Sequence, residues 1–367
     1  MNESQKHDSA FAFRQDLPGY TVPHDRLVEF RKMMSELNKA AKADAKPEAC
    51  YICGEEMPKF CNSHTVPQYC LREIADNGKL LTTSALMGGN LLDSEIGIKD
   101  AATFKQVCRK CDTEYFKLYE TPETLLSEPT SQVLGQIAAK NLLREISKAR
   151  LELGLRNALG NRSTAGLDAM TNVRAVDAAE DEKAFDIAIR VGKSNKSSSA
   201  YHLIFYRVLP YVAPFAFQQM ISPISDFEGG MINNAYNPSA NYRMEPMHLC
   251  VLPTKGQTVV LAFRSEKANR YRDFEKQLRM FSEDQILQSI VKLIFAYSED
   301  VLISRKISPK ALNDDNLAVL SRMNHNYFGF GDSPEEYRRI TLKTALSEFA
   351  IDNLPEPPAL LSEEFAL

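Results

Sequence analysis

The feature that most constrains this chain is a pair of Cys-x-x-Cys motifs placed far apart. Cys50 and Cys53 form the first motif, Cys108 and Cys111 form the second, and residues 54–107 lie between them. Two cysteines at this spacing bind one metal ion through a tight turn, and two such pairs complete the tetrahedral four-cysteine set typical of structural zinc. We therefore predict one structural zinc ion bound by these four thiolates, with a functional element inserted between the pairs.

The alternative interpretation is that these are four unrelated reduced cysteines. The chain has seven cysteines, and an odd number does not favour a complete set of disulfides. Residues 1–13 lack the basic start and apolar run of a secretory signal, and no apolar run reaches the length of a membrane span. We expect a cytoplasmic protein, and a reducing compartment favours metal binding by paired cysteines. Cys61, Cys70 and Cys250 have no such spacing, so we expect them to be small buried side chains.

The length of 367 residues predicts two domains. We expect a helical lead-in over residues 1–47, a zinc module over 48–120, a helical connector over 121–158 and a larger mixed α+β domain over 159–367. The fold class predicted for the whole chain is α+β.

Hydrophobic periodicity predicts the main elements. Short runs of β-branched and aromatic residues predict strands over 201–209, 247–252 and 258–263, with a hairpin turn at Lys255-Gly256-Gln257. Apolar residues at helical spacing predict helices, and small polar stretches predict loops. The predicted helices cover 24–45, 121–155 and two segments after residue 267, and the predicted loops cover 160–181 and 192–199. Residues 215–237 are dense in turn formers and aromatic residues, which is typical of a recognition loop but also of ordinary turns.

A short motif follows the first cysteine pair: Asn62-Ser63-His64-Thr65-Val66-Pro67-Gln68. The order Cys-x-x-Cys, His-x-Val-Pro, Cys-x-x-Cys-Asp resembles the branch of the HNH, or ββα-metal, endonucleases that carries a four-cysteine zinc site. The resemblance covers residues 48–120 and implies a treble-clef, ββα-metal fold for this module. It also implies metal-dependent hydrolysis of DNA or RNA phosphodiesters, in a regulated defence or toxin effector.

The resemblance assigns roles to three residues. His64 is the implied general base, because a neutral imidazole accepts a proton from water near physiological pH. Asp112 follows Cys111 directly, and Glu120 lies about two helical turns further on. Both carboxylates are predicted to ligate a catalytic magnesium or manganese ion.

The chain also departs from the family pattern. Ser63 stands where the family often has an acidic residue or a second histidine, and no histidine or asparagine occurs among residues 113–116. A second interpretation therefore stays open, in which His64 is a packing histidine. The module would then bind nucleic acid or protein without cleaving it.

The formal net charge of −4 excludes binding to nucleic acid through overall charge, so any contact has to be local. We predict phosphate contacts from four residues, which we call the basic cluster. One interpretation of the aromatic residues interleaved with them is that they stack on bases. Alternatively, the aromatic side chains pack inward from an amphipathic helix. The basic cluster is Lys105, Arg109, Lys110 and Lys117, and the aromatic residues are Tyr115, Phe116 and Tyr119.

The second half of the chain contains no recognisable catalytic motif. Gly192-Lys193-Ser194 lacks the glycine spacing of a phosphate-binding loop. His202, His248 and His325 are isolated in the sequence, so we expect packed or surface histidines. The partners predicted for the chain are a nucleic acid, a protein bound by the C-terminal domain, and no membrane.

Overall fold

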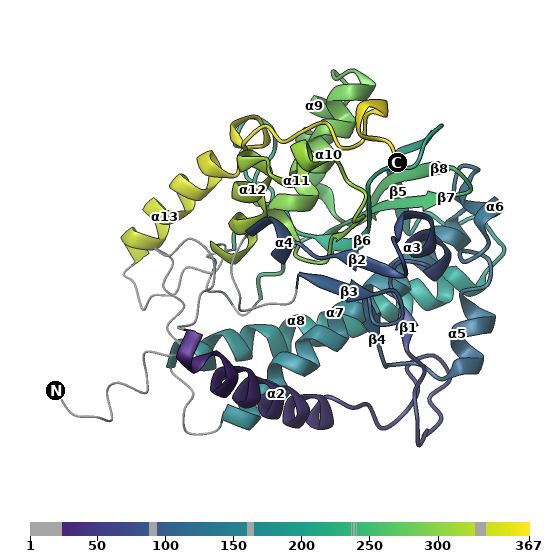
Figure 1. Cartoon of the computed structure of the whole chain (residues 1–367), viewed down its shortest axis with the longest axis vertical. Helices are drawn as coiled ribbons and strands as arrows, with labels where there is room; N and C mark the ends of the chain where they lie inside the picture. Colours follow the sequence, from purple (N-terminus) through teal and green to yellow (C-terminus); the bar gives the residue numbers. More distant parts are fainter. Residues whose placement is uncertain are drawn as a thin grey trace.

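The computed structural model describes residues 24–87, 94–159, 165–235, 237, 239, 241–326 and 335–367. The fold is mixed α+β, as predicted, with the four cysteines near the N-terminus and a larger region after them. A sheet runs through the middle of the molecule, with α9 to α12 on one side and α7, α8 and α2 on the other (Figure 1).

The central sheet has seven strands in the order β3-β2-β9-β6-β7-β8-β5, and the neighbouring strands pair antiparallel. The three predicted strands are confirmed, and Lys255 and Gly256 form the hairpin turn between β7 and β8 with φ angles of 51° and 75°. The strands are β2 (Lys79–Leu81), β3 (Glu95–Gly97), β5 (Tyr201–Leu209), β6 (Phe215–Ile221), β7 (Met247–Thr254), β8 (Gln257–Ser265) and β9 (Leu302–Ile303).

Strand β7 is buried along its whole length because the sheet is covered on both faces. Leu249 and Val251 pack into a core with α10 (Glu283–Tyr297). Cys250 and Leu252 point the other way, into a core that contains α7 (Ser131–Leu159) and the cysteine region. Strand periodicity thus explains why an apolar run serves two cores at once.

The remaining helices are mostly short and lie in the segments that connect the strands or that precede and follow the sheet. Helix α2 (Leu27–Asp44), preceded by η2 (His24–Arg26), confirms the predicted first helix. The others are α3 (Gln68–Ile74), α4 (Ser84–Met87), α5 (Arg109–Tyr115), α6 (Pro122–Leu125), η4 (Asn269–Tyr271), α9 (Arg272–Leu278), α11 (Pro309–Leu312), α12 (Asp315–Asn326), α13 (Glu335–Glu348), η5 (Ile351–Asn353) and η6 (Glu363–Phe365).

The predicted loop over residues 160–181 is wrong from residue 165 onward. Helix α8 spans Ala165–Lys193, and residues 160–164 lie outside the described part of the chain. The stretch is rich in alanine, which favours helix and also permits close packing. Helices α7 and α8 approach so closely that a Cβ on Gly135 would lie 2.6 Å from the backbone nitrogen of Gly192.

The loop predicted over residues 215–237 is wrong at its start. Phe215 and Phe217 belong to β6, between β9 and β7, and both side chains are fully buried. In the loop that follows, the Asp226 Oδ1 atom accepts a hydrogen bond from the Gly230 backbone nitrogen at 2.7 Å. The buried Asn233 amide donates to the Pro223 carbonyl at 2.9 Å, so these polar residues stabilise the turns of the loop itself.

The segment between the cysteine pairs joins the large sheet. Strand β2 pairs with β3 on one side and, through Leu81 and Ile303, with β9 on the other. Because β9 pairs with β6, residues 48–120 share both a sheet and a core with the later part of the chain.

Candidate metal centre and candidate active site

The structure brings the four predicted cysteines together. The Sγ atoms of Cys50, Cys53, Cys108 and Cys111 all lie within 4.8 Å of one another. A zinc–sulfur bond of about 2.3 Å places the sulfurs of a tetrahedral site about 3.8 Å apart, so this donor set fits a closed metal site. The prediction that these residues form one centre is confirmed at the level of a metal-binding cluster.

Local structure explains how each pair is formed. After Cys53, Gly54 has a φ of 74° and donates its backbone N–H to the Cys50 carbonyl at 2.8 Å, which closes the first turn. Cys108 caps α5, and its Sγ atom accepts a hydrogen bond from the Cys111 N–H at 3.4 Å. The Cys108 N–H donates to the Cys50 Sγ atom at 3.3 Å and so connects the pairs.

The electrostatics of the cysteines also fit a cation. Burial and the neighbouring sulfurs of Cys108, Cys53 and Cys50 raise the pKa of Cys111 above its ordinary value. Burial acts in the same direction at Cys50, but backbone N–H groups outweigh it and lower the pKa of that thiol. A bound cation would remove the repulsion among four thiolates.

The module has the ββα arrangement that the resemblance implies. Strand β1 (Ser63–His64) pairs antiparallel with β4 (Thr103–Phe104), and α5 follows β4 with two of the cysteines at its start. Residues 65–102 separate the two strands and carry α3, β2, α4 and β3. This segment attaches the module to the large sheet through β2 and β3.

His64 lies on β1, half-buried, with its Nε2 atom 2.9 Å from the carbonyl oxygen of Ile98. Because a carbonyl oxygen only accepts, Nε2 donates, and Nδ1 of the neutral ring is then the proton acceptor. Burial lowers the pKa of His64, which favours this neutral form. The geometry is compatible with a general base, and that role stays a prediction.

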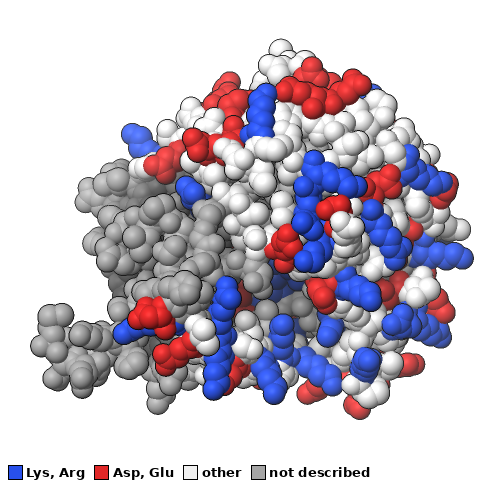
Figure 2. All heavy atoms as spheres, viewed as in Figure 1, with Lys and Arg blue, Asp and Glu red and all other residues white. Residues whose placement is uncertain are grey.

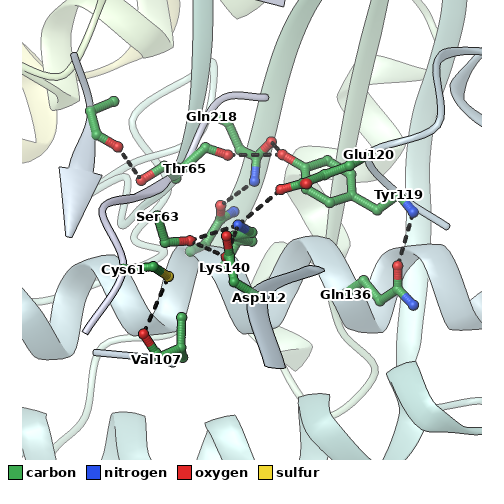
Figure 3. A network of polar contacts seen from close by, with 12 residues as sticks. Cys61, Ser63, Thr65, Val107, Asp112, Tyr119, Glu120, Gln136, Lys140 and Gln218 are labelled. Carbon is green, nitrogen blue, oxygen red and sulfur yellow. Dashed lines mark hydrogen bonds and ion pairs between the residues drawn. The ribbon is translucent and has the colours of Figure 1, made fainter. Parts of the chain in front are cut away.

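Asp112 and Glu120 meet at a lysine that the sequence did not bring to attention. The Lys140 Nζ atom lies 2.9 Å from Asp112 Oδ1 and 3.0 Å from Glu120 Oε1. It also donates to the Ser63 hydroxyl at 2.8 Å, as Figure 3 shows. The Lys140 side chain is fully buried, whereas those of Asp112 and Glu120 are 22% and 34% exposed.

These contacts set the charge of Asp112. Burial acts to raise the pKa of this carboxyl, but Lys140 and the Ser63 hydroxyl outweigh burial and lower it. Ser63 Oγ lies 2.5 Å from Asp112 Oδ1. Ser63, a departure from the family pattern, therefore belongs to the polar group around Lys140. The signal for Lys140 was a charged residue within the apolar stripe of a predicted helix, because lysine is almost never fully buried unless it is paired.

The residues predicted to hold a catalytic cation do not fit one as they lie. Within the described part of the chain, the only group of three or more His, Cys, Asp or Glu ligands is the four-cysteine cluster. His64, Asp112 and Glu120 do not form a second group, and Lys140 already pairs with both carboxylates. Ligation of magnesium or manganese by Asp112 and Glu120 stays a prediction.

A buried chain of hydrogen bonds links the module to the sheet. The Tyr119 hydroxyl lies 2.8 Å from the Thr65 carbonyl and 2.6 Å from Gln218 Oε1 on β6. Gln218 donates to Asn141 Oδ1 at 3.0 Å, and the Asn141 amide contacts His248 Nδ1 at 3.0 Å. Burial lowers the pKa of His248 to about 3, so its neutral ring accepts this last bond. His248 is a packed histidine, as predicted.

The basic cluster is exposed, but the aromatic residues beside it are not. Lys105, Arg109, Lys110 and Lys117 all face solvent. Figure 2 shows basic side chains, with acidic ones among them, over the side of the molecule where α5 lies. Of the two interpretations of the aromatic residues, inward packing is confirmed, so these rings are not available for base stacking. Tyr115 is 8% exposed, and Phe116 and Tyr119 are fully buried.

The remaining isolated residues have ordinary surroundings. Cys70 and Cys250 are fully buried, as expected, while the half-buried Cys61 donates to the Val107 carbonyl at 3.2 Å. His202 is partly exposed, 3.4 Å from a Glu275 oxygen, and the side chain of His325 lies outside the described residues. No described helix has both the length and the apolar character that crossing a bilayer requires.

Comparison of the chain with protein-family models, with curated proteins and with solved structures found no match. The resemblance to HNH endonucleases therefore rests on the order of motifs in residues 48–120 and on the ββα geometry of the four-cysteine module.

Proposed function

We propose that the metal of the four-cysteine cluster is a structural zinc ion. Four thiolates complete a tetrahedron and leave no position for water, so the ion has a folding role and no catalytic one. Elemental analysis of the purified chain should find about one zinc per molecule. Cys53→Ser, which changes the exposed ligand, should lower the zinc content, whereas Cys250→Ser, which changes a cysteine outside the four-cysteine cluster, should not.

We further propose that this module hydrolyses phosphodiester bonds in nucleic acid, with His64 as the general base. The observation that carries the proposal is the hydrogen bond from Nε2 to the Ile98 carbonyl. It orients the ring and leaves Nδ1 to accept a proton. Among the described residues, no side chain hydrogen-bonds to Nδ1.

The exposed surface of the module suits a polyanion. The basic cluster is exposed at and around α5, on the module that carries His64. Phosphate contacts of this kind position a nucleic acid without reading its sequence. A chain with a net charge of −4 needs such a local concentration of basic residues, and its binding should weaken steeply with salt.

Each residue of the site would have a distinct role in the reaction. His64 Nδ1 takes the proton of the attacking water as the water oxygen bonds to phosphorus and the bond from phosphorus to the leaving oxygen breaks; the leaving oxygen takes a proton from solvent. The negative charges of Asp112 and Glu120 favour the imidazolium that forms. Lys140 and Ser63 hold Asp112 in place, and both carboxylates are paired with Lys140, not with a divalent cation.

The test is incubation of the zinc-loaded chain with plasmid, single-stranded DNA and RNA. His64→Ala should reduce cleavage by about 10²- to 10⁴-fold, with little change in zinc content or melting temperature. His202→Ala, a partly exposed histidine at the edge of the sheet, is the matched control and should cleave normally. Full activity of the His64→Ala variant would exclude the proposed role. Loss of any toxicity in cells on the same substitution would support a toxin or defence role.

A second candidate function is binding without cleavage, and Lys140 favours it, because the ammonium already neutralises part of the charge that a catalytic cation would meet. A wild-type chain that binds nucleic acid in a salt-dependent way but cuts none of the three substrates would select this function. A protein partner of the larger region is part of both proposals.

A further inference from the structure

We infer that Lys140 permanently supplies the positive charge that a divalent cation would otherwise supply between Asp112 and Glu120. Lys140 is thus a positioning residue of the site. This role rests on the proposed function only in that the site is called an active site. The predicted effect on cation binding can be measured without any cleavage.

The Lys140 ammonium is surrounded by acceptors. It donates hydrogen bonds to Ser63 Oγ and Asp112 Oδ1 and forms an ion pair with Glu120 Oε1, and all three oxygens lie within 3.0 Å of the Nζ atom. The group also lies over the Phe116 ring, 4.1 Å from its centroid. Because the Lys140 side chain is fully buried among these groups, it does not face a phosphate in solvent, and its role is to neutralise and hold the two carboxylates.

The position of Lys140 is built into the fold. The residue lies within the long helix α7, in a buried run that packs against the sheet and the module. Its neighbour Asn141 is held by Gln218 and His248. An ammonium buried in this way stays in place, because leaving its partners would leave buried charges unpaired.

Binding of a divalent cation to Asp112 and Glu120 is electrostatically unfavourable. The one positive charge of Lys140 already offsets half of the two negative charges of Asp112 and Glu120. Asp112 Oδ1 in addition accepts from both Ser63 and Lys140. A second cation bound to the same carboxylates would lie near the ammonium in a partly buried site, where like charges repel strongly.

The direct test is manganese binding to the zinc-loaded full chain, followed by electron paramagnetic resonance. Asp112→Asn should leave manganese affinity unchanged, because the wild-type site does not bind the ion. Lys140→Met keeps the apolar stem and removes the charge, so it should raise manganese affinity by at least about tenfold. The double variant Lys140→Met/Asp112→Asn should lose that gain.

Two outcomes overturn the inference. One is wild-type binding of manganese that falls about tenfold or more in Asp112→Asn, since a carboxylate ligand would then be in use. The other is a folded Lys140→Met chain with no gain in affinity. Zinc content and circular dichroism report folding. If Lys140→Met does not fold, the comparison of wild type with Asp112→Asn decides alone.

The same variants separate this inference from the proposed function. A chain that shows the expected manganese pattern but cuts no nucleic acid fails only as a nuclease. A chain that cuts only with manganese, and binds it through Asp112, is a nuclease and refutes the role of Lys140. Cleavage by the zinc-loaded chain without added magnesium or manganese would support both.

Discussion

Helix α7 carries two ion clusters, and their compositions are opposite. At Lys140, one cation lies between two carboxylates. Further along the same helix, Arg144 and Lys148 both pair with Asp300, which comes from outside the helix. Arg144 Nη2 lies 2.9 Å from Asp300 Oδ1, and Lys148 Nζ lies 2.5 Å from Asp300 Oδ2. Both clusters connect distant parts of the chain, but they leave different groups available to solvent.

The Asp300 cluster encloses its carboxylate. Gln219 on β6 also donates to Asp300 Oδ2 at 2.9 Å, and the carboxylate is 14% exposed. Arg144 in turn donates to the carbonyl of Thr103, which pairs with His64 across β1 and β4. This cluster therefore fixes the position of the module on the sheet, and nothing about it points to a ligand.

The Lys140 cluster is open on its acidic side. Its cation is fully buried, whereas Asp112 and Glu120 keep 22% and 34% of their side chains exposed. In both clusters the minority charge is largely enclosed, so what differs is the sign of the flanking groups that reach solvent: two cations around Asp300 and two carboxylates around Lys140. The partly exposed carboxylates lie on the module that carries His64 and belong to a candidate site, whereas the cations hold the module on the sheet.

The largest effect expected from this comparison is that of Asp300→Asn. It leaves Arg144 and Lys148 without their shared counter-ion, each with about a fifth of its side chain exposed. We expect a loss of roughly 2–4 kcal/mol in the free energy of unfolding, toward the lower end of what breaking a buried pair costs. Urea unfolding at pH 7 measures it. If Asp300→Asn lowered the free energy of unfolding by less than a Lys140 variant does, the Asp300 cluster would not be the more stabilising of the two.

Lys140→Met should cost less, about 1–2 kcal/mol, because Asp112 and Glu120 regain water where they are exposed and the methionine keeps the contacts with Phe116. The same unfolding measurement applies. Lys183→Met is the matched control, because it removes the charge of an exposed lysine that pairs with Glu180 on α8, and it should change stability little. A cost of Lys140→Met above that of Asp300→Asn would show that the open cluster is the main structural one.

A smaller effect should appear only in acid. Burial acts to raise the pKa of Asp300, but Arg144 and Lys148 outweigh it and hold that pKa well below its usual range. Because the folded-state pKa lies below the unfolded-state value, this stabilisation is complete above about pH 5 and is lost as pH falls. Unfolding free energies measured between neutral and acidic pH should fall less steeply in Asp300→Asn than in wild type. Equal slopes would contradict the assignment.

Several elements could be predicted from sequence because their signals are local. The spacing within each cysteine pair encodes a turn, with Gly54 supplying its left-handed residue. Strand β5 could be predicted from its own run of apolar and aromatic residues. The β7–β8 hairpin could be predicted from two such runs on either side of Lys255-Gly256. Helix α8 and strand β6 were missed because alanine-rich and aromatic stretches suit several structures until packing selects one.

The four-cysteine cluster, the place of His64 after the first pair and the mixed α+β class could all be predicted from the amino-acid order. The pairing of β2 with the large sheet and the position of Lys140 between Asp112 and Glu120 could not, and they became visible only in the folded chain. The two groups differ in how far apart along the chain the interacting residues lie. A metal-binding turn is specified by residues three positions apart, whereas a buried ion pair depends on how α7 packs against a module whose residues lie far away in the chain.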